Sequence, residues 1–223
     1  MEAFIIIDAI SDLHGFLPCD LAGGDLLIIC GDLTARDFEN EHALFDYWIN
    51  DQKYKKKIVI AGNHDNVLQE KRLKYQFCDY LCDSGTEFEG LKIWGSPWSR
   101  TFEGMNPYCK AFTCETEEEL TEKWALIPED TDILITHSPP HEILDQVYYI
   151  DHGKDQAEHV GSTSLKEYVL NKVKPKLWIW GHIHEAYGQG EIFLDYQNTI
   201  VCVNASHVNE LFMPVNKPIR IIL

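Results

Sequence analysis

The sequence alternates short apolar runs with helical patterns, and this alternation restricts the fold more than any other feature. Eight runs rich in Ile, Val and Leu predict β-strands, at 4–10, 26–30, 57–61, 91–94, 132–136, 176–180, 199–203 and 218–222. Several of these runs are apolar at consecutive positions, which indicates strands that are buried on both faces. Strands of this kind need covering layers on both sides.

Three segments between these runs have the features of amphipathic helices. In 39–50, the apolar side chains of Ala43, Leu44, Tyr47 and Trp48 form one stripe. Each of the two later helices is predicted to begin with a capping box and to end at a proline. These signals are Thr116 with Glu119 before Pro128, and Ser164 with Glu167 before Pro175.

The ratio of strands to helices predicts an α/β sandwich with two sheets, because about four helices have to cover about eight strands. The 223 residues, 45% of them apolar, are enough for a substantial core. A linker rich in Gly, Pro or Ser that would divide the chain is not found. We therefore expect a single domain that covers residues 1–223.

Charge and cysteine content narrow the class of protein. The formal net charge of -17 argues against binding along a nucleic-acid backbone, which requires a basic face. The one lysine cluster, in 53–57, is interpreted as a solvated surface. A transmembrane helix or secretory signal is not expected, because the apolar runs are much shorter than roughly 20 residues and the start is not basic. The seven cysteines are interpreted as reduced thiols, which predicts a cytoplasmic protein.

Five short polar motifs lie at or just past the ends of predicted strands. Taken singly, each has the composition of an ordinary turn. In layered α/β folds, however, the carboxyl ends of the strands are where sites assemble, so the motifs are expected to converge. The motifs are Asp12-Leu13-His14, Gly31-Asp32, Gly62-Asn63-His64-Asp65, Thr136-His137 and Gly181-His182-Ile183-His184.

Together the motifs contain enough potential ligands for two divalent cations. Two cations roughly 3.5 to 4 Å apart can polarise a phosphoryl group and convert bound water to hydroxide near neutral pH. One carboxylate has to bridge them, and Asp32 is the natural choice. Oxygen and nitrogen donors without thiolate suit Mn, Fe or Zn better than Ca or Mg.

In order and spacing the motifs resemble those of the calcineurin-like metallophosphoesterases, whose pattern runs D-x-H, G-D, G-N-H-[DE], H and G-H-x-H. All five blocks are present between residues 12 and 184. The resemblance implies a four-layer α/β/β/α sandwich of two mixed β-sheets flanked by helices. It also implies two divalent transition metals, with Mn favoured and Fe or Zn as alternatives.

The resemblance assigns roles to individual residues. Asp32 would bridge the metals, and His64 would contact the phosphate and protonate the leaving oxygen, with Asp65 as a partner that orients His64. The remaining ligands divide into Asp12, His14 and His184 for the first metal and Asn63, His137 and His182 for the second.

Further segments resemble the metallophosphoesterase-domain-containing proteins of animals and their microbial relatives, also described as fetal brain protein-like. These segments include 94–98, 136–140, 184–188 and Asn204-Ala205-Ser206. Some members of that group have Gly where this chain has His182, so a fully active dinuclear centre is expected here. The protein Ser/Thr phosphatases continue Gly-Asp as G-D-x-x-D-R-G, whereas this chain has Ala35-Arg36-Asp37, which argues against protein phosphatase activity.

We therefore predict a phosphodiesterase that acts on small phosphodiesters or nucleotides, cyclic nucleotides included, by in-line attack of a metal-bridging hydroxide. The alternatives are a nuclease acting on DNA or RNA ends and a weakly active nucleotide-binding scaffold. Extended nucleic-acid binding and membrane association are not expected, and the sequence does not indicate an oligomeric state.

Other side chains have both a functional and a purely structural interpretation. The polar segment 145–161, with His152 and His159, is either a lid over the site or an ordinary surface loop. The same two interpretations apply to His141, His207, Trp94 and Trp98, and an aromatic ring near the site could stack on a nucleobase.

Overall fold

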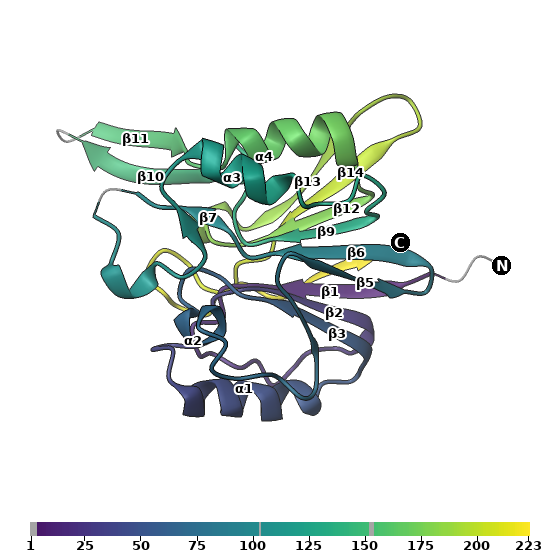
Figure 1. The fold of residues 1–223 in the computed structure, drawn as a ribbon, viewed down its shortest axis with the longest axis vertical. Coiled ribbons are helices and arrows are strands. Elements are labelled where there is room, and N and C mark those ends of the chain that lie inside the picture. Colours follow the sequence, from purple (N-terminus) through teal and green to yellow (C-terminus); the bar gives the residue numbers. More distant parts are fainter. Residues whose placement is uncertain (1–3, 103, 152–153) are drawn as a thin grey trace.

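Two mixed β-sheets pack face to face, and helices cover their outer faces, as the ribbon in Figure 1 shows. The computed structural model describes residues 4–102, 104–151 and 154–223. The first sheet has the order β15-β1-β2-β3-β4 and the second has the order β13-β14-β12-β9-β6-β5. This arrangement confirms the predicted four-layer α/β/β/α sandwich.

In the first sheet, β1 to β4 run parallel and β15 pairs with β1 in antiparallel register. In the second sheet, β6, β9, β12 and β14 run parallel, and the edge strands β5 and β13 are antiparallel. The bounds of the first sheet are β1 (Ile6–Ile10), β2 (Gly24–Cys30), β3 (Tyr54–Ile60), β4 (Asp79–Leu81) and β15 (Ile219–Ile222). Those of the second are β5 (Ser84–Phe88), β6 (Leu91–Ser96), β9 (Ile133–Thr136), β12 (Leu177–Trp180), β13 (Gly188–Phe193) and β14 (Thr199–Asn204).

Consecutive apolar residues in the central strands serve two different cores. In β2, Leu26 and Ile28 face the second sheet, whereas Leu27 and Ile29 face helix α1 (Glu39–Asn50). A third core lies between the second sheet and the helices α3 (Glu117–Trp124) and α4 (Thr163–Tyr168). Because alternate side chains of a strand point to opposite faces, a fully apolar run is what a strand between two layers requires.

The predicted helices are present, with one correction at a helix start. Thr116 and Glu119 form the expected capping box at α3. The cap of α4, however, is Ser162, whose hydroxyl accepts the amide of Leu165, and the predicted cap Ser164 instead donates its hydroxyl to Glu117. A π-helical turn, Val169–Val173, continues α4, and α2 (Asn66–Gln69) follows the third polar motif.

The segment 145–161 contains a β-hairpin in place of an irregular loop. Its strands are β10 (Gln146–Asp151) and β11 (Lys154–His159), paired in antiparallel register from Gln146 to His159. A short parallel pair, β7 (Ser99–Arg100) and β8 (Thr113–Cys114), lies between β6 and α3 in sequence. The 3-10 turns Pro107–Cys109 and His184–Ala186 complete the described elements.

Candidate metal centre

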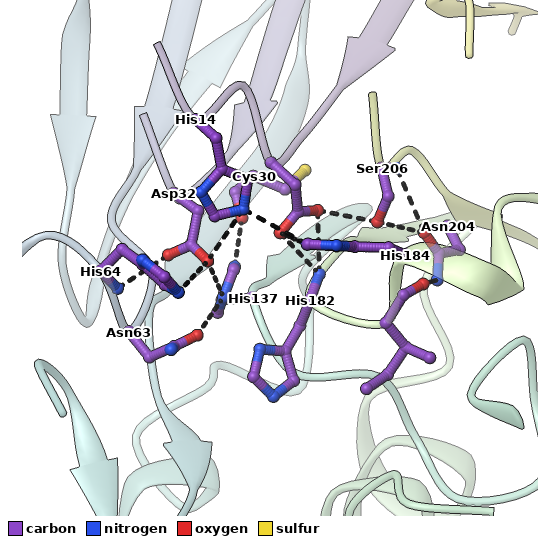
Figure 2. Close-up of polar contacts among 12 residues, drawn as sticks. His14, Cys30, Asp32, Asn63, His64, His137, His182, His184, Asn204 and Ser206 are labelled. Carbon is purple, nitrogen blue, oxygen red and sulfur yellow. Dashed lines mark hydrogen bonds and ion pairs between the residues drawn. The ribbon is translucent and has the colours of Figure 1, made fainter. Parts of the chain in front are cut away.

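The polar motifs meet at the carboxyl ends of parallel strands from both sheets. Asp12, Asp32 and Asn63 follow β1, β2 and β3 of the first sheet, whereas His137 and His182 follow β9 and β12 of the second. Figure 2 shows the side chains of these loops gathered around Asp32. The structure therefore brings together all seven residues that the sequence suggested as metal ligands.

The first group of potential ligands consists of Asp12, His14 and His184, whose donor atoms lie within 4.8 Å of one another. The Nε2 atoms of His14 and His184 are 3.3 Å apart, and His184 Nε2 is 3.6 Å from Asp12 Oδ1. The Asp12 carboxylate is fully buried. It also accepts the backbone amide of His182, at 3.0 and 3.1 Å from its two oxygens.

The second group consists of Asp32, His137 and His182, and Asn63 adjoins it. His137 Nε2 lies 3.0 Å from Asn63 Oδ1 and 3.5 Å from Asp32 Oδ2. The same Asp32 oxygen is 3.8 Å from His14 Nε2, so it faces ligands of both groups. The other oxygen, Oδ1, accepts the backbone amide of His64 at 2.9 Å, which fixes the carboxylate plane.

The backbone of the site adopts conformations that are uncommon for residues with side chains. Asp12, His14, Asp32 and His182 have φ values of 52°, 42°, 54° and 69°. Such left-handed residues are energetically unfavourable and concentrate at functional sites. The loops therefore hold these side chains in place at a cost that the surrounding structure has to offset.

Glycine allows close approach in the third motif. A Cβ atom at Gly62 would lie 2.3 Å from Asp32 Oδ1 and 2.5 Å from His137 Cε1. The first motif and the last are packed as tightly, because a Cβ at Gly181 would lie 2.2 Å from Asp12 Oδ2. Gly62 is thus required by the approach of one ligand from its own sheet, Asp32, and one from the opposite sheet, His137, whereas Gly181 is required by the approach of Asp12 from the opposite sheet.

The surroundings of His137 and Asn63 orient their donor atoms. His137 Nδ1 donates to the carbonyl of Cys30 at 2.8 Å, which leaves Nε2 to face the site. Asn63 Nδ2 donates to the carbonyl of Cys109 at 3.0 Å, which leaves Oδ1 to face the site. Contacts of this kind select the tautomer and the amide orientation that metal binding needs.

The protonation of the imidazoles differs between neighbours. Burial lowers the pKa of His14 to about 4 and that of His182 to about 3, in the second case aided by the charge of His137. Both rings are therefore neutral at pH 7. Burial also acts to lower the pKa of His137, but the charge of Asp32 and its hydrogen bond outweigh burial and raise this pKa to about 9. His137 therefore carries a proton at pH 7, and its Nε2 would have to lose that proton to bind a cation.

The donor set fits two divalent cations. Two ring nitrogens about 3.3 Å apart, as in His14 and His184, have the separation of adjacent ligands on one tetrahedral ion with metal–nitrogen distances of about 2.0–2.1 Å. The donors are carboxylate, amide and imidazole, which transition metals accept. Asp32 Oδ2 belongs to the second group and also faces His14 of the first, so the site has the composition of a dinuclear centre.

Asp65 has surroundings that differ from the expected contact with His64. Its carboxylate is fully buried and accepts three backbone amides, from Gly62 at 2.8 Å, Asp32 at 2.9 Å and Leu33 at 3.1 Å. A bond to the His64 ring is not among the contacts of the described residues. Asp65 therefore ties the loop after β2 to the loop after β3, and the expectation that it orients His64 is corrected to a positioning role for the loops.

His64 lies at the edge of the ligand groups and remains accessible. Its side chain is 25% exposed, and its Nε2 is 3.9 Å from Asp32 Oδ2. The other ring nitrogen, Nδ1, lies 3.5 Å from Cys109 Sγ. This placement, beside the ligands and open to the cavity, is compatible with the predicted contact to a phosphate.

Several residues at the site were not assigned a role from the sequence. Ser206 donates its hydroxyl to Asp12 Oδ2 at 2.7 Å, and Asn204 donates to the carbonyl of Ile183 at 2.8 Å. The Phe212 ring packs edge-on against the rings of His14 and His184, with centroids 4.9 and 5.1 Å apart. Asn204-Ala205-Ser206 carried a family signal, whereas nothing in the local pattern marked Phe212.

A cavity of about 810 Å³ opens over the centre, and both His141 and His159 line it. The base of the hairpin thus belongs to the site. His207 donates its Nδ1–H to the carbonyl of Asn216, and Trp98 donates to Asp83, both away from the cavity lining. Trp94 packs against the third core, between the second sheet and the helices α3 and α4, and His152 lies outside the described residues.

The family model for the calcineurin-like phosphoesterases matches residues 6–186. The chain belongs to this family. Its members are metal-dependent hydrolases of phosphoesters with a dinuclear centre, and the ligand groups described above supply the residues for one. The sequence-based assignment of the family is confirmed.

Individual relatives are similar over most of the chain. Metallophosphoesterase domain-containing protein 1 of Homo sapiens and of Mus musculus is 35% identical, over 95% of this chain and 69% of the relative. A UPF0046 protein of Caenorhabditis elegans is 33% identical, over 82% of this chain and 68% of the relative. A crystal structure with 15% identity superposes with a TM-score of 0.59 over 91% of this chain and 90% of the other, which supports the fold.

None of the described helices is long and apolar enough to cross a membrane. The seven cysteines are free thiols, and Cys30, Cys114 and Cys202 are buried.

Proposed function

We propose that the protein is a dinuclear metal-dependent phosphodiesterase that hydrolyses small phosphodiesters, cyclic nucleotides among them. The observation that carries this proposal is the position of Asp32. One of its oxygens faces His14 of one ligand group and His137 of the other, at 3.8 and 3.5 Å. A carboxylate in this position is suited to two cations at once.

The donor types support manganese, with iron or zinc as alternatives. Each ligand group mixes carboxylate oxygen with imidazole nitrogen, and the described ligand groups contain no thiolate. When bound, two such cations neutralise the charge of the phosphate and activate a water molecule near neutral pH. The protein has to supply the geometry and the proton for the departing oxygen.

His64 is the residue we assign to that proton. Its Nε2 lies beside Asp32, its backbone amide is tied to Asp32 Oδ1, and its ring is accessible from the cavity. A phosphate bound beside Asp32 at the ligand groups would present its leaving oxygen toward the accessible ring of His64. Protonation of the leaving group by a positioned histidine contributes about 10² to 10⁴ in rate.

The cavity supports a substrate larger than a phosphate. Its volume is about 810 Å³, and its lining includes the apolar side chains of Phe102, Val147 and Phe212. Arg100 is the one Lys or Arg side chain in this lining. The net charge of -17 further disfavours a nucleic-acid polymer. We therefore assign a small diester as the substrate, in a protein whose free thiols suit the cytoplasm.

The test is hydrolysis of bis-p-nitrophenyl phosphate and of cyclic nucleotides by protein loaded with Mn. Activity is expected for the native chain and not for Asp32→Ala, whereas Asp130→Ala, an exposed carboxylate paired with Lys92, is the matched control and keeps activity. Metal-dependent turnover equal to that of Asp32→Ala would overturn the proposal.

Two further assays separate the alternatives. Faster cleavage of a labelled oligonucleotide than of a cyclic nucleotide would support a nuclease. Tight nucleotide binding by metal-loaded protein without hydrolysis would support a scaffold. In either case, the phosphodiesterase proposal for small substrates fails.

A further inference from the structure

A second cluster of titratable side chains lies at the cavity outside the metal centre, at the base of the β10–β11 hairpin. His141 and His159 line the cavity, and Asp145 is buried behind them. His159 Nδ1 is 2.6 Å from Asp145 Oδ1, and His141 Nδ1 is 3.8 Å from Asp145 Oδ2. The two rings meet edge to face with centroids 5.8 Å apart.

The carboxylate behind the histidines is fixed in orientation. Asp145 is fully buried, and its Oδ2 accepts the backbone amides of Glu142 and Gly161, each at 2.9 Å. Oδ1 is left to accept the Nδ1–H of His159. Because Nδ1 is the donor in this bond, the Nε2 atom of His159 is free to bind a ligand.

The base of the hairpin is also held in place by its neighbours. The amide of His141 donates to the carbonyl of Ser162 at 3.1 Å, and the amide of Ser162 donates to the carbonyl of Pro139 at 3.0 Å. A Cβ at Gly161 would lie 2.4 Å from the Pro140 carbonyl oxygen, so the two segments touch. A group supported in this way can bind a substrate without first being ordered.

A purely structural role does not account for the exposure of the imidazoles. The two backbone amides already stabilise the buried Asp145 carboxylate, yet His159 and His141 keep 40% and 32% of their side chains exposed. Both are in the cavity lining together with the metal ligands His182 and His184. Their free edges are therefore available to whatever occupies the cavity.

The charge around the cluster indicates the chemistry of that occupant. Among the described residues, the lining contains four glutamates and one arginine: Glu117, Glu158, Glu185, Glu210 and Arg100. A second phosphate would be repelled by this lining. Hydroxyl groups, in contrast, can both donate to carboxylates and pair with imidazole nitrogens, and Ser138 and Thr163 add further hydroxyl partners.

From this geometry we infer that His159, positioned by Asp145, and its neighbour His141 form a recognition subsite for the hydroxyl groups of the organic part of a phosphodiester, such as a ribose. The inference rests on the proposed function for the choice of a diester. The centre takes the phosphate, and the hairpin base takes the alcohol portion.

The first test measures binding and does not depend on turnover. Full-length zinc-loaded protein is labelled with ¹⁵N-histidine, and the His159 resonances are assigned by comparison with His159→Gln. Adenosine 5′-monophosphate is expected to shift the His159 Nε2 resonance, whereas inorganic phosphate is not. A resonance that both probes move equally indicates an anion site, and one that neither moves at 10 mM indicates no subsite; either result overturns the inference.

The second test compares substrates with and without hydroxyl groups. In His159→Ala, kcat/KM for adenosine 3′,5′-cyclic phosphate is expected to fall about tenfold more than kcat/KM for bis-p-nitrophenyl phosphate, mostly through KM, as for one lost hydrogen bond. His159→Gln is expected to recover part of that loss. Equal losses on both substrates would assign His159 a structural role and overturn the inference.

Tyr148 provides a matched control on the same hairpin. Tyr148→Ala changes the same hairpin at a side chain that is 63% exposed and outside the cavity lining, and it is expected to leave both substrates unaffected. If the native chain hydrolyses neither substrate, the proposed function fails, and the nucleotide titration alone decides on the subsite.

Discussion

Replacing Gly62 with alanine tests whether the close packing of the ligand loops sets the geometry of the centre. The added Cβ would lie 2.3 Å from Asp32 Oδ1. Restoring an ordinary contact of 3.4 Å moves the two atoms apart by about 1.1 Å, which is 3.4 minus 2.3. Gly62 is not among the glycines with positive φ, so the clash, and not backbone strain, is what the substitution introduces.

The consequences for rate and stability differ in size. A displacement of about 1 Å at a positioning group costs about 100-fold in rate. Overpacking a core position costs about 1–3 kcal/mol of unfolding free energy, and each kcal/mol lowers Tm by about 2–4 °C in a chain of this size. We therefore expect Gly62→Ala to be a folded protein with about 1% of the native kcat/KM.

The assay is hydrolysis of bis-p-nitrophenyl phosphate with Mn, combined with metal content by mass spectrometry and a thermal melt. Gly190→Ala is the matched control, because a Cβ there would meet nothing within 4 Å. Native activity and a full complement of metal in Gly62→Ala would refute the reasoning, since the ligands would then tolerate the displacement.

Three other predictions concern the proton donor, the cations and the pH dependence. His64→Ala should lower kcat about 10² to 10⁴-fold on esters with poor leaving groups and less on p-nitrophenyl esters, with metal content unchanged by mass spectrometry. Removal of the cations with EDTA should lower Tm, and Mn at 100 times its Kd should restore about 2.7 kcal/mol of stability in a thermal melt, unless no cation binds. Because the pKa of His137 is raised to about 9, its proton has to leave before Nε2 can bind a cation. Apparent metal affinity should therefore fall about tenfold for each pH unit below 9, and calorimetry in two buffers should detect the released proton; a pH-independent affinity would contradict this.

The central strands and the ligand set could be predicted because the apolar runs in the sequence agree with what the layered fold requires at the same positions. Runs such as 26–30 are apolar at every position, and only a strand between two layers satisfies that pattern. The ligands follow such strands directly, so parallel strand ends bring Asp12, Asp32 and His137 to one place. Strand direction and strand order are enough to place these residues together, and the packing of side chains is not needed.

The hairpin and the role of Asp65 could not be predicted because they depend on contacts between distant segments. Strand β11 is polar apart from Ala157, and β10 places its apolar and aromatic residues at the consecutive positions 147–150, so neither strand shows the alternation of a strand with one buried face. Asp65 was expected at His64, next to it in sequence, but the amides of Asp32 and Leu33 come closer in space. Short-range sequence patterns cannot distinguish between such partners.

Because its ligands come from both sheets, the centre links the two sheets when it binds metal, in addition to its role in catalysis. Asp12, Asp32 and Asn63 come from loops of one sheet, and His137, His182 and His184 from loops of the other. All the ligands come together only when the two sheets have docked, so we expect both cations to bind after that step of folding. Without cations, the buried carboxylates of Asp12 and Asp32 face the imidazoles of His184 and His137 across this seam, and amide hydrogen exchange should be fastest in the loops that border it.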